Sequence, residues 1–579
     1  MTYRAPVRDL TFALYEVAGF GRVAELERFA GSDKAGTAEV LEGAGRFAEG
    51  VLAPLNRPGD VEGARFENGR VFAAAGFADA YRRYAADGWN CLAADPEHGG
   101  AGLPRAVALA AFEFVHAANM SFGLCPTLTE AAVHCLDAHG NERQKAIYLP
   151  ELVSGRWTGT MNLTEAQSGS DLALVRTRAE PNGNGGYKLN GQKIFITWGD
   201  HDAADNIVHL VLARLPNAPA GVKGISLFLA PKFLVDENGK PGAANALRAI
   251  SIEHKLGIHA SPTCVMAYED ASAELVGVEG QGLPQMFTMM NAARVNVGMQ
   301  GVGIAERAYQ QALAFSLERR QGRSPWASDY PARLFDLPDV RGMLMLMKCK
   351  IEAARAICLS TAVAADLADY AADASAREAA KLREELLVPI AKGWSTDVGV
   401  EVASLGVQIH GGMGFIEETG AAQHYRDARI APIYEGTNGI QAMDLIGRKL
   451  PAMPALIAEM RETVAQMQSR SELAMFAATF DQGVQSLQGA VDILTARKGT
   501  PDALAAATPF LALAGDVVGG WMHAKSVLAT GADADYAKTR RALAEFYAAH
   551  VLVRAPARIA AIAAGAASFA DLTPSALGA

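Results

Sequence analysis

The chain has 579 residues, of which 50% are hydrophobic and 20% charged, an ordinary composition for a folded globular protein. Its 53 basic and 63 acidic residues give a formal net charge of −10, which argues against a nucleic-acid partner, because that binding needs clustered positive charge. No charge-free run of about 20 apolar residues predicts stable membrane insertion, and no secretory signal is expected. The six cysteines form no Cys-x-x-Cys pair, so we expect buried thiols, a reducing cytoplasmic compartment and no metal site.

Residues 1–157 form the first predicted domain, which is helical. Within it Ala108, Ala111, Phe112 and Val115 recur at positions i, i+3, i+4 and i+7. This spacing places the four side chains on one face of a helix.

Residues 158–281 follow a different pattern, in which short alternating runs predict β-strands. Two such runs, 187–189 and 192–197, flank Asn190-Gly191, a dipeptide that favours a hairpin turn because both turn positions need positive φ. Further strands are predicted at 207–212, 225–229 and 263–268. No helix-length segment separates these strands, so we expect an antiparallel barrel or sandwich.

Helical periodicity returns in the rest of the chain. Residues 282–450 are predicted to form long helices of a bundle, and residues 451–579 an additional helical domain. Pro501 and the segment 531–535 predict breaks between helices of that last domain. Its clearest apolar stripe consists of Ile457, Met460, Val464 and Met467.

Four short motifs carry the chemistry. Each is ordinary by itself, because acidic residues and glycines are common in turns and at helix ends. Together, in this order and spacing, they resemble the acyl-CoA dehydrogenase family, and the resemblance covers roughly residues 80–450. The motifs are LTEAQSGSD at 163–171, NGQKIFIT at 190–197, QIHGGMGF at 408–415 and IYEGTNGIQ at 433–441.

This resemblance implies a mostly α fold with a central antiparallel β domain. The expected order is an N-terminal helical domain, a β-barrel and a C-terminal four-helix bundle, followed here by residues 451–579. That extra domain resembles the longer, very-long-chain-type members and a bacterial branch that includes 3-methylmercaptopropionyl-CoA dehydrogenases. The opening Tyr3–Leu10 also resembles this bacterial branch.

The reaction implied is α,β-desaturation of an acyl-CoA thioester with FAD as cofactor. By resemblance Glu435 is the base that removes the Cα proton, and its own N–H, with a ribityl hydroxyl of FAD, holds the thioester oxygen. Some relatives carry the base just before the arginine that matches Arg294, but that position is Ala293 here. Arg294 would help to position the Glu435 loop and CoA; its alternative is a helix-surface ion pair. The residues expected at the substrate are Ser170, Arg294, Tyr434 and Gly436.

The first group of implied FAD contacts lies in the β domain. Leu163 and Thr164 match residues that meet the flavin ring, and Ser170 matches one at the pyrophosphate or the CoA side. Thr197 matches a residue that hydrogen-bonds near flavin N5, and Phe195 matches an aromatic packed against the ring. The alternatives are turn capping for Thr164 and Ser170 and core packing for Phe195.

Two residues of this loop depart from the family pattern. Ala166 stands where a proline is usual, and Ser168 where an alanine is usual. Without the proline the loop lacks one fixed φ angle, which loosens the expected contacts.

The second group of implied FAD contacts lies in the bundle. Arg319 matches an arginine that reaches the FAD of a neighbouring subunit; its alternative is a solvated patch at a helix end. The match at the adenine end of that FAD comprises Gln408, Gly411 and Gly412, and Thr437 matches a further contact. These contacts imply that the active site is not complete in a monomer. A homodimer is favoured over a tetramer, because residues 451–579 could cover the face at which shorter members of the family stack as tetramers. His410 is expected to be structural, and Gly301-x-Gly303 lies in a helical run, so NAD is not implied.

The leading interpretation is an FAD-dependent acyl-CoA dehydrogenase that passes electrons to an electron-transfer flavoprotein. Its expected substrate is 3-methylmercaptopropionyl-CoA or a medium-chain acyl-CoA, with a long-chain acyl-CoA next. The alternatives are an acyl-CoA oxidase that reduces O₂ and, more remotely, a non-catalytic scaffold that binds flavin or acyl-CoA. The final domain could cover the dimer face or meet a membrane; a solvated basic face is the favoured interpretation of Arg540, Arg541, Arg554 and Arg558.

Overall fold

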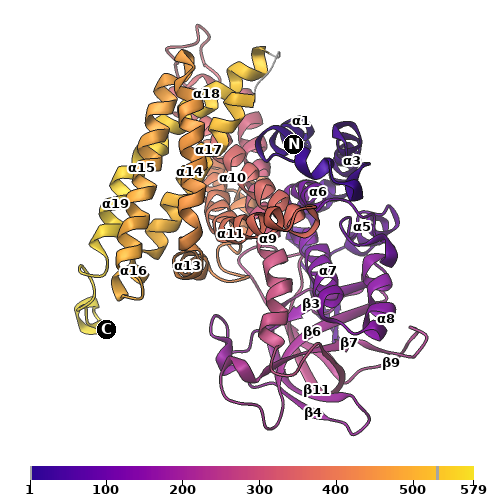
Figure 1. Cartoon of the computed structure of the whole chain (residues 1–579). Helices are drawn as coiled ribbons and strands as arrows, with labels where there is room; N and C mark the ends of the chain where they lie inside the picture. Colours follow the sequence, from indigo (N-terminus) through magenta and orange to yellow (C-terminus); the bar gives the residue numbers. More distant parts are fainter. Residues whose placement is uncertain (1–2, 530–533) are drawn as a thin grey trace. The chain divides into compact units, whose positions relative to one another are not determined.

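The computed structural model describes residues 3–529 and 534–579 (Figure 1). They divide into two compact units. The mixed unit contains residues 3–5 and 40–296, and the helical unit contains residues 6–39 and 297–579. The border between the two units at 296–297 lies inside helix α9 (Gly282–Glu318). These two units do not test the boundaries of the four predicted domains, which stay a prediction.

The helices of the mixed unit begin with residues 40–47 of α3 (Lys34–Phe47), followed by α4 (Ala53–Glu62) and α5 (Phe77–Ala86). They continue with α6 (Arg105–Ala118), α7 (Met120–His139) and α8 (Glu142–Val153). Asn side chains begin the last two: Oδ1 of Asn119 accepts from the N–H of Phe122, and Asn141 forms a capping box with Gln144. The predicted face in α6 is buried, as are all its residues after Arg105, so this helix lies inside the unit.

The strands of the mixed unit form a seven-stranded sheet. Strand β7 pairs with both β11 and β6, so β11, β5, β4, β6 and β7 close a ring, as the barrel prediction requires. Two short hairpins stand apart from it, β1 with β2 and β8 with β9. The sheet strands are β3 (Trp157–Asn162), β4 (Arg178–Pro181), β5 (Tyr187–Thr197), β6 (Asn206–Arg214), β7 (Ile225–Pro231), β10 (Leu247–Ile252) and β11 (Thr263–Val276); the hairpins are β1 (Arg65–Glu67), β2 (Arg70–Phe72), β8 (Phe233–Val235) and β9 (Pro241–Ala244).

The sheet is not wholly antiparallel, which corrects one detail of the prediction. Strand β6 pairs in parallel with β3 and with β4. The chain makes its antiparallel pair β4–β5 before it returns along β6, so β3, β4 and β6 run in the same direction. The remaining pairings of the sheet are antiparallel.

The hairpin predicted at Asn190-Gly191 is wrong, because both residues lie inside the long strand β5. Opposite them, β11 carries a register irregularity at Asp270, whose φ is 61°. Asn190 bonds this bulge twice: its Nδ2 donates to Oδ1 of Asp270 at 2.7 Å, and its Oδ1 accepts from the Asp270 N–H at 2.9 Å. A Cβ on Gly191 would lie 2.9 Å from the Cα of Thr177. The dipeptide therefore accommodates a bulge and a close strand contact.

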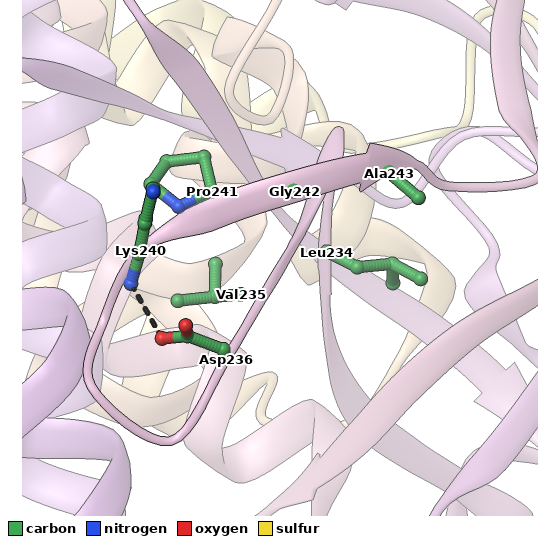
Figure 2. A pocket seen from close by; sticks show the side chains of 7 residues that line it. All are labelled: Leu234, Val235, Asp236, Lys240, Pro241, Gly242 and Ala243. Carbon is green, nitrogen blue, oxygen red and sulfur yellow. Dashed lines mark hydrogen bonds between the residues drawn. The ribbon is translucent and has the colours of Figure 1, made fainter.

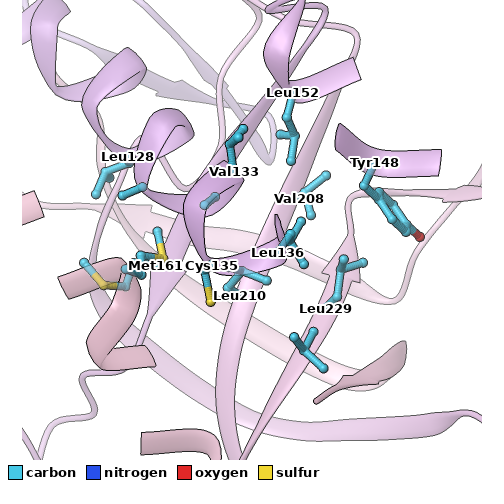
Figure 3. Close-up of a cluster of buried hydrophobic side chains, with 14 of the residues drawn as sticks. Leu128, Val133, Cys135, Leu136, Tyr148, Leu152, Met161, Val208, Leu210 and Leu229 are labelled. Atoms are coloured by element: carbon cyan, nitrogen blue, oxygen red, sulfur yellow. The ribbon is translucent and has the colours of Figure 1, made fainter. Parts of the chain in front are cut away.

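A buried apolar cluster packs α7 and α8 against the sheet, as Figure 3 shows. Leu128, Val133 and Leu136 of α7 belong to this cluster. The helix approaches β3 so closely that a Cβ on Gly159 would lie 2.4 Å from the Cβ of Ala132. This packing supports the end of β3, from which the motif at 163–171 begins.

A row of buried polar side chains runs along the parallel pair β3–β6. Nε2 of His201 lies 3.0 Å from Oγ1 of Thr158, and Nδ1 of His209 lies 2.7 Å from Oγ1 of Thr160. Burial, and then the charge of Lys232, lowers the pKa of each histidine to about 3. Both imidazoles are therefore neutral at neutral pH.

These two histidines should make the protein less stable in acid. Their folded pKa lies below the usual 6.5, so between these values the unfolded state binds more protons and the free energy of unfolding falls as pH falls. Each histidine contributes about 1.4 kcal/mol per pH unit below pH ~6. We expect urea unfolding of His209→Gln to show a shallower pH slope by that amount. The exposed His254→Gln is the control; equal slopes for the two variants would contradict this account.

The helical unit is built on three long helices, α9 from residue 297 onward, α10 (Pro338–Tyr370) and α11 (Ala374–His410). Gly301 lies at the contact of α9 with α11, where a Cβ would lie 2.5 Å from the carbonyl oxygen of Ser395. The Gly-x-Gly pattern at 301–303 lies within α9, as predicted, and Gly301 serves the packing of this helix against α11. Shorter helices of this unit include α1 (Val7–Phe12), α12 (Ala421–Ala428) and α13 (Asn438–Asp444).

The C-terminal part of the helical unit is helical as predicted. The stripe of Ile457, Met460, Val464 and Met467 is buried, and the predicted break at Pro501 is the start of α16. Of the other predicted break, residues 531–533 lie outside the described residues. The helices are α14 (Met453–Gln468), α15 (Ala474–Ala496), α16 (Pro501–Ala505), α17 (Ala507–Ala529), α18 (Ala534–His550) and α19 (Ala555–Ala564).

The predicted basic face is only partly solvated. Arg540 is 5% exposed, and its guanidinium donates to Glu352 at 2.7 Å and to Asp9 at 2.6 Å. Arg558 pairs with the buried Asp516 at 2.7 Å. These two arginines bind α18 and α19 to the rest of the unit. In the part of the chain that the structure describes, no helix is both long and apolar enough to span a membrane.

Candidate active site

Glu435 lies in the loop between α12 and α13, in a strained backbone conformation. Its φ is 55°, and that of the next residue, Gly436, is 84°. The loop closes on itself, because the N–H of Asn438 donates to the carbonyl of Pro432 at 3.0 Å. A non-glycine residue with positive φ is uncommon and persists only where its surroundings fix it. The surroundings of the loop therefore hold Glu435 and Gly436 in this conformation.

Tyr434 and Thr437 lie on either side of the Glu435–Gly436 pair in the same loop of the helical unit. The hydroxyl of Tyr434 donates to Oε1 of Gln300, and burial, followed by the charge of Glu435, raises the pKa of this phenol. Oγ1 of Thr437 accepts from the N–H of Ile440 at 3.2 Å and so caps α13. Both side chains thus hold the loop by ordinary hydrogen bonds.

The β-domain candidates for flavin contact lie together at the start of the 163–171 motif. The N–H of Ile194 donates to the carbonyl of Thr164 at 2.9 Å, which joins this segment to β5 beside Phe195 and Thr197. Phe195 is 58% exposed and has a φ of 61°, so it is not packed in the core. An exposed aromatic face beside two half-buried threonines, Thr164 and Thr197, fits a flat ring with polar edges such as a flavin.

A buried ion pair that sequence reasoning missed fixes this segment. Nζ of Lys193 donates to Oε1 of Glu165 and to the carbonyl of Leu163, both at 2.9 Å. Glu165 also accepts from Arg176 and Thr177. Burial opposes its ionisation, but the Lys193 charge and these hydrogen bonds lower the pKa of Glu165 to about 2; burial lowers the pKa of Lys193 to about 8. A lysine inside an apolar strand was the only hint of this pair.

Hydrogen bonds within the segment hold its turn around Ala166, where the usual proline of the family is missing. The segment turns at Glu165 and Ser168, whose backbone groups exchange hydrogen bonds of 2.9 Å. Oγ of Ser168 donates to the carbonyl of Asp171 at 2.6 Å, and Asp171 caps the following turn. Ser170 itself is exposed. The capping role considered for Ser170 therefore belongs to its neighbour Asp171.

Arg294 is buried within the mixed unit, which rules out the surface ion pair considered for it. Its Nη1 donates to Oδ1 of Asn291 at 3.2 Å, and its guanidinium lies 5.7 Å from the centre of the Phe287 ring. Ala293 beside it is also buried. An aromatic platform and an amide orient the guanidinium.

The candidates for the FAD of a second subunit are exposed on the helical unit. Arg319 follows the last residue of α9, and Gln408 lies on the exposed side of α11. Gly411, whose φ is 59°, ends that helix, and a Cβ on it or on Gly412 would have no atom within 4 Å. The surface is thus open to a partner here.

Two other features have no part in this site. His410 stacks on Phe315, with ring centres 4.4 Å apart, and its Nδ1 lies 2.7 Å from the carbonyl of Gly406, which is the structural role expected for it. A cavity of about 350 Å³ lies in the β8–β9 hairpin (Figure 2). Asp236 in this cavity accepts the Lys240 N–H at 2.9 Å and shapes the turn.

Family models match most of the chain. The N-terminal domain of acyl-CoA dehydrogenases matches residues 37–156, the middle domain 160–271 and the C-terminal domain 280–450. A fourth model, described as acetyl-CoA dehydrogenase C-terminal like, matches residues 456–573. The family predicted from the four motifs is confirmed, and the additional C-terminal part matches a model of its own.

Individual relatives agree with the family models. The chain is 47% identical to the 3-methylmercaptopropionyl-CoA dehydrogenase of Ruegeria pomeroyi, over 96% of this chain and 97% of the relative. The fold of this chain is similar to that of Caenorhabditis elegans ACDH-11 in complex with C11-CoA, with a TM-score of 0.79 and 19% identity. The match covers 99% of this chain and 96% of that chain. The chain also resembles a Bacillus anthracis acyl-CoA dehydrogenase complexed with FAD, with a TM-score of 0.70, 22% identity and coverage of 84% and 82%.

These matches establish the predicted fold class, the enzyme class and the cofactor. The fold is mostly helical, with a central sheet and an extra C-terminal helical part. We conclude that the chain belongs to the acyl-CoA dehydrogenase family and is an FAD-dependent acyl-CoA dehydrogenase, an oxidoreductase of acyl-CoA thioesters.

Proposed function

We propose that this enzyme converts 3-methylmercaptopropionyl-CoA to its 2-enoyl-CoA and passes the electrons to an electron-transfer flavoprotein. The choice of substrate rests on the 47% identity to the Ruegeria pomeroyi dehydrogenase over nearly the full length of both chains. A medium-chain acyl-CoA is the second candidate. The methylthiopropanoyl chain has nearly the size of a short alkyl chain, and its thioether adds no strong hydrogen bond by which a pocket could distinguish it from an alkyl chain.

Glu435 is proposed as the base of this reaction. Its carboxylate takes the proton from Cα as the Cα–Cβ double bond forms. FAD, when bound, accepts the hydride that leaves Cβ. The N–H of Glu435 holds the thioester oxygen, which stabilises the charge that develops there as the proton leaves. The strained backbone at Glu435 and Gly436 supports this assignment, because such strain gathers at functional sites.

The remaining site residues are proposed as binding groups. Leu163, Thr164, Phe195 and Thr197 bind the flavin ring, and Ser170 binds the pyrophosphate or the CoA. The substrate is positioned with the help of Arg294, Tyr434 and Gly436. Thr437 is proposed as a further FAD contact, in addition to capping α13 through its Oγ1, which accepts from the N–H of Ile440.

We propose a homodimer in which each FAD is completed by the second subunit. The observation behind it is the open surface at Gly411 and Gly412, with Gln408 and Arg319 exposed on the same unit. The C-terminal helices, ion-paired to the bundle through Arg540, cover a face of the dimer in this proposal and do not meet a membrane. An enzyme that elutes as a monomer with full FAD content would contradict the homodimer.

Substrate choice is tested by comparing kcat/KM for 3-methylmercaptopropionyl-CoA, butanoyl-CoA, octanoyl-CoA and palmitoyl-CoA. We expect the first to rank highest, with butanoyl-CoA, whose chain is one atom shorter, lower by about 10-fold to 200-fold, since one methylene in an apolar pocket is worth about 1–3 kcal/mol. Palmitoyl-CoA ranking first would overturn the substrate assignment in favour of a long-chain enzyme.

The electron acceptor is tested with the same substrate under air. The dehydrogenase interpretation predicts turnover that depends on added electron-transfer flavoprotein and negligible formation of hydrogen peroxide. Peroxide formed at the rate of turnover, without any flavoprotein present, would identify an acyl-CoA oxidase instead.

A further inference from the structure

One buried lysine of α11 holds the loop that carries Glu435. Lys392 is 0% exposed. Its Nζ donates to the carbonyl of Gly436 at 2.8 Å and to Oδ1 of Asn438 at 3.0 Å. The ammonium therefore contacts the residue directly after the proposed base and a second residue at the end of the loop.

Asn438 extends this anchor to both sides. Its Nδ2 donates to the carbonyl of Gly393 at 2.9 Å and to Oδ1 of Asp397 at 2.8 Å, both on α11. Its own N–H donates to the carbonyl of Pro432 at 3.0 Å, at the start of the loop. Lys392 and Asn438 thus fix the two ends of the segment 432–438 against one helix.

The anchored peptides are those next to the strained residue. Glu435 and Gly436 have consecutive positive φ angles, and such a conformation persists only when neighbouring groups fix it. The Gly436 carbonyl receives a charged donor, which makes a shorter and stronger hydrogen bond than a neutral one. Nε2 of Gln441 adds a longer contact to the same carbonyl at 3.4 Å. Of these two donors to the Gly436 carbonyl, the lysine is the closer and the charged one.

We propose that Lys392 is a positioning residue for the base, which rests on the proposed role of Glu435. Its ammonium keeps the Glu435 backbone in the left-handed conformation, so that the carboxylate faces Cα and the N–H faces the thioester oxygen. Without this donor, the Gly436 carbonyl and the Asn438 amide lose their buried partner, and the loop relaxes. Misplacement of a catalytic group by about 1 Å costs about 100-fold in rate.

The test compares Lys392→Met with Lys350→Met. Lys350 is the matched control, because it is also a buried lysine of the helical unit but pairs with Glu401, which lies outside the segment 432–438. For Lys392→Met we expect flavin reduction under anaerobic conditions to slow about 100-fold, with KM changed less than about threefold. Because proton removal then limits the rate, the isotope effect of an α-deuterated substrate should rise. Lys392→Arg should recover part of the rate.

Hydrogen–deuterium exchange gives a second reading that does not depend on turnover. Amides of residues 432–438 should exchange much faster in Lys392→Met and at the wild-type rate in Lys350→Met. If Lys392→Met does not fold, Asn438→Ser serves in its place, because it removes one of the two acceptors of Lys392; we then expect about tenfold slower reduction and faster loop exchange.

Glu435→Gln, measured in parallel, separates the two claims. If Glu435→Gln is inactive while Lys392→Met or its substitute reduces flavin normally and keeps a protected loop, the positioning role of Lys392 is overturned and the base assignment stands. If Glu435→Gln remains fully active, the base assignment falls, whatever Lys392→Met does. Equal slowing in Lys392→Met and Lys350→Met, without faster loop exchange, would also overturn the positioning role.

Discussion

Replacement of Glu435 by glutamine is expected to abolish flavin reduction by acyl-CoA and to leave the FAD content unchanged. Glutamine has the size of glutamate but cannot take the Cα proton, and the loss of a general base costs about 100-fold to 10,000-fold in rate. The fold of the loop should survive, because Lys392 and Asn438 hold it through the backbone and not through the Glu435 side chain. The measurement is the rate of flavin bleaching after anaerobic mixing, with flavin content read from the absorbance of the resting protein.

The matched control for this variant is Glu462→Gln. Glu462 is an exposed glutamate of α14 in the same helical unit. The change removes one negative charge and leaves the segment 432–438 unaltered. We expect wild-type rates from it. A Glu435→Gln enzyme that binds FAD and turns over at the wild-type rate would show that the base lies elsewhere.

Lys193→Met should lower the free energy of unfolding by about 3–5 kcal/mol, because it leaves the buried Glu165 carboxylate without its cation. The same change frees the carbonyl of Leu163, to which Lys193 also donates. The segment with Leu163 and Thr164 should then lose its position beside β5, and the purified protein should contain less FAD. Urea unfolding gives the stability, and the ratio of flavin to protein absorbance gives the FAD content.

Two further variants identify the cause of that loss. Lys188 lies on the same strand, and its Nζ donates to Oγ of Ser272 at 2.8 Å. Lys188→Met should change the free energy of unfolding by less than about 0.5 kcal/mol. In the double variant Lys193→Met/Glu165→Gln, the buried group is neutral, so we expect less destabilisation than in Lys193→Met alone. Equal losses in Lys193→Met and Lys188→Met would contradict a role for the buried pair.

Much of the architecture was predictable because hydrophobic spacing reports burial directly. The stripe Ile457–Met467 and the buried face of α6 follow from helical periodicity, and the alternating runs at 207–212 and 225–229 became β6 and β7. Predictions from local sequence were wrong where pairing with a strand distant in the sequence determined the structure. Asn190-Gly191 has the composition of a turn, but pairing with β11 keeps it in a strand and uses it at a bulge.

The candidate site was predictable only in part, for a similar reason. The motif residues are contiguous, and their resemblance to a family is specific. The roles of Lys193 and Lys392 could not be predicted from a local motif, because their partners Glu165 and Gly436 lie 28 and 44 residues away in the sequence. Nor does a basic residue in a helix reveal whether it is solvated: Arg540 was expected on a solvated face and instead makes buried ion pairs. Burial of a charge depends on tertiary partners that periodicity does not report.

The most direct test of the central claim is an anaerobic titration of the purified yellow protein with 3-methylmercaptopropionyl-CoA, followed by flavin absorbance. We expect the flavin to bleach in proportion to added substrate and to stay reduced until an electron-transfer flavoprotein or an artificial acceptor is added. A yellow protein that neither this substrate nor any other acyl-CoA bleaches would contradict the chemistry assigned to Glu435 and FAD.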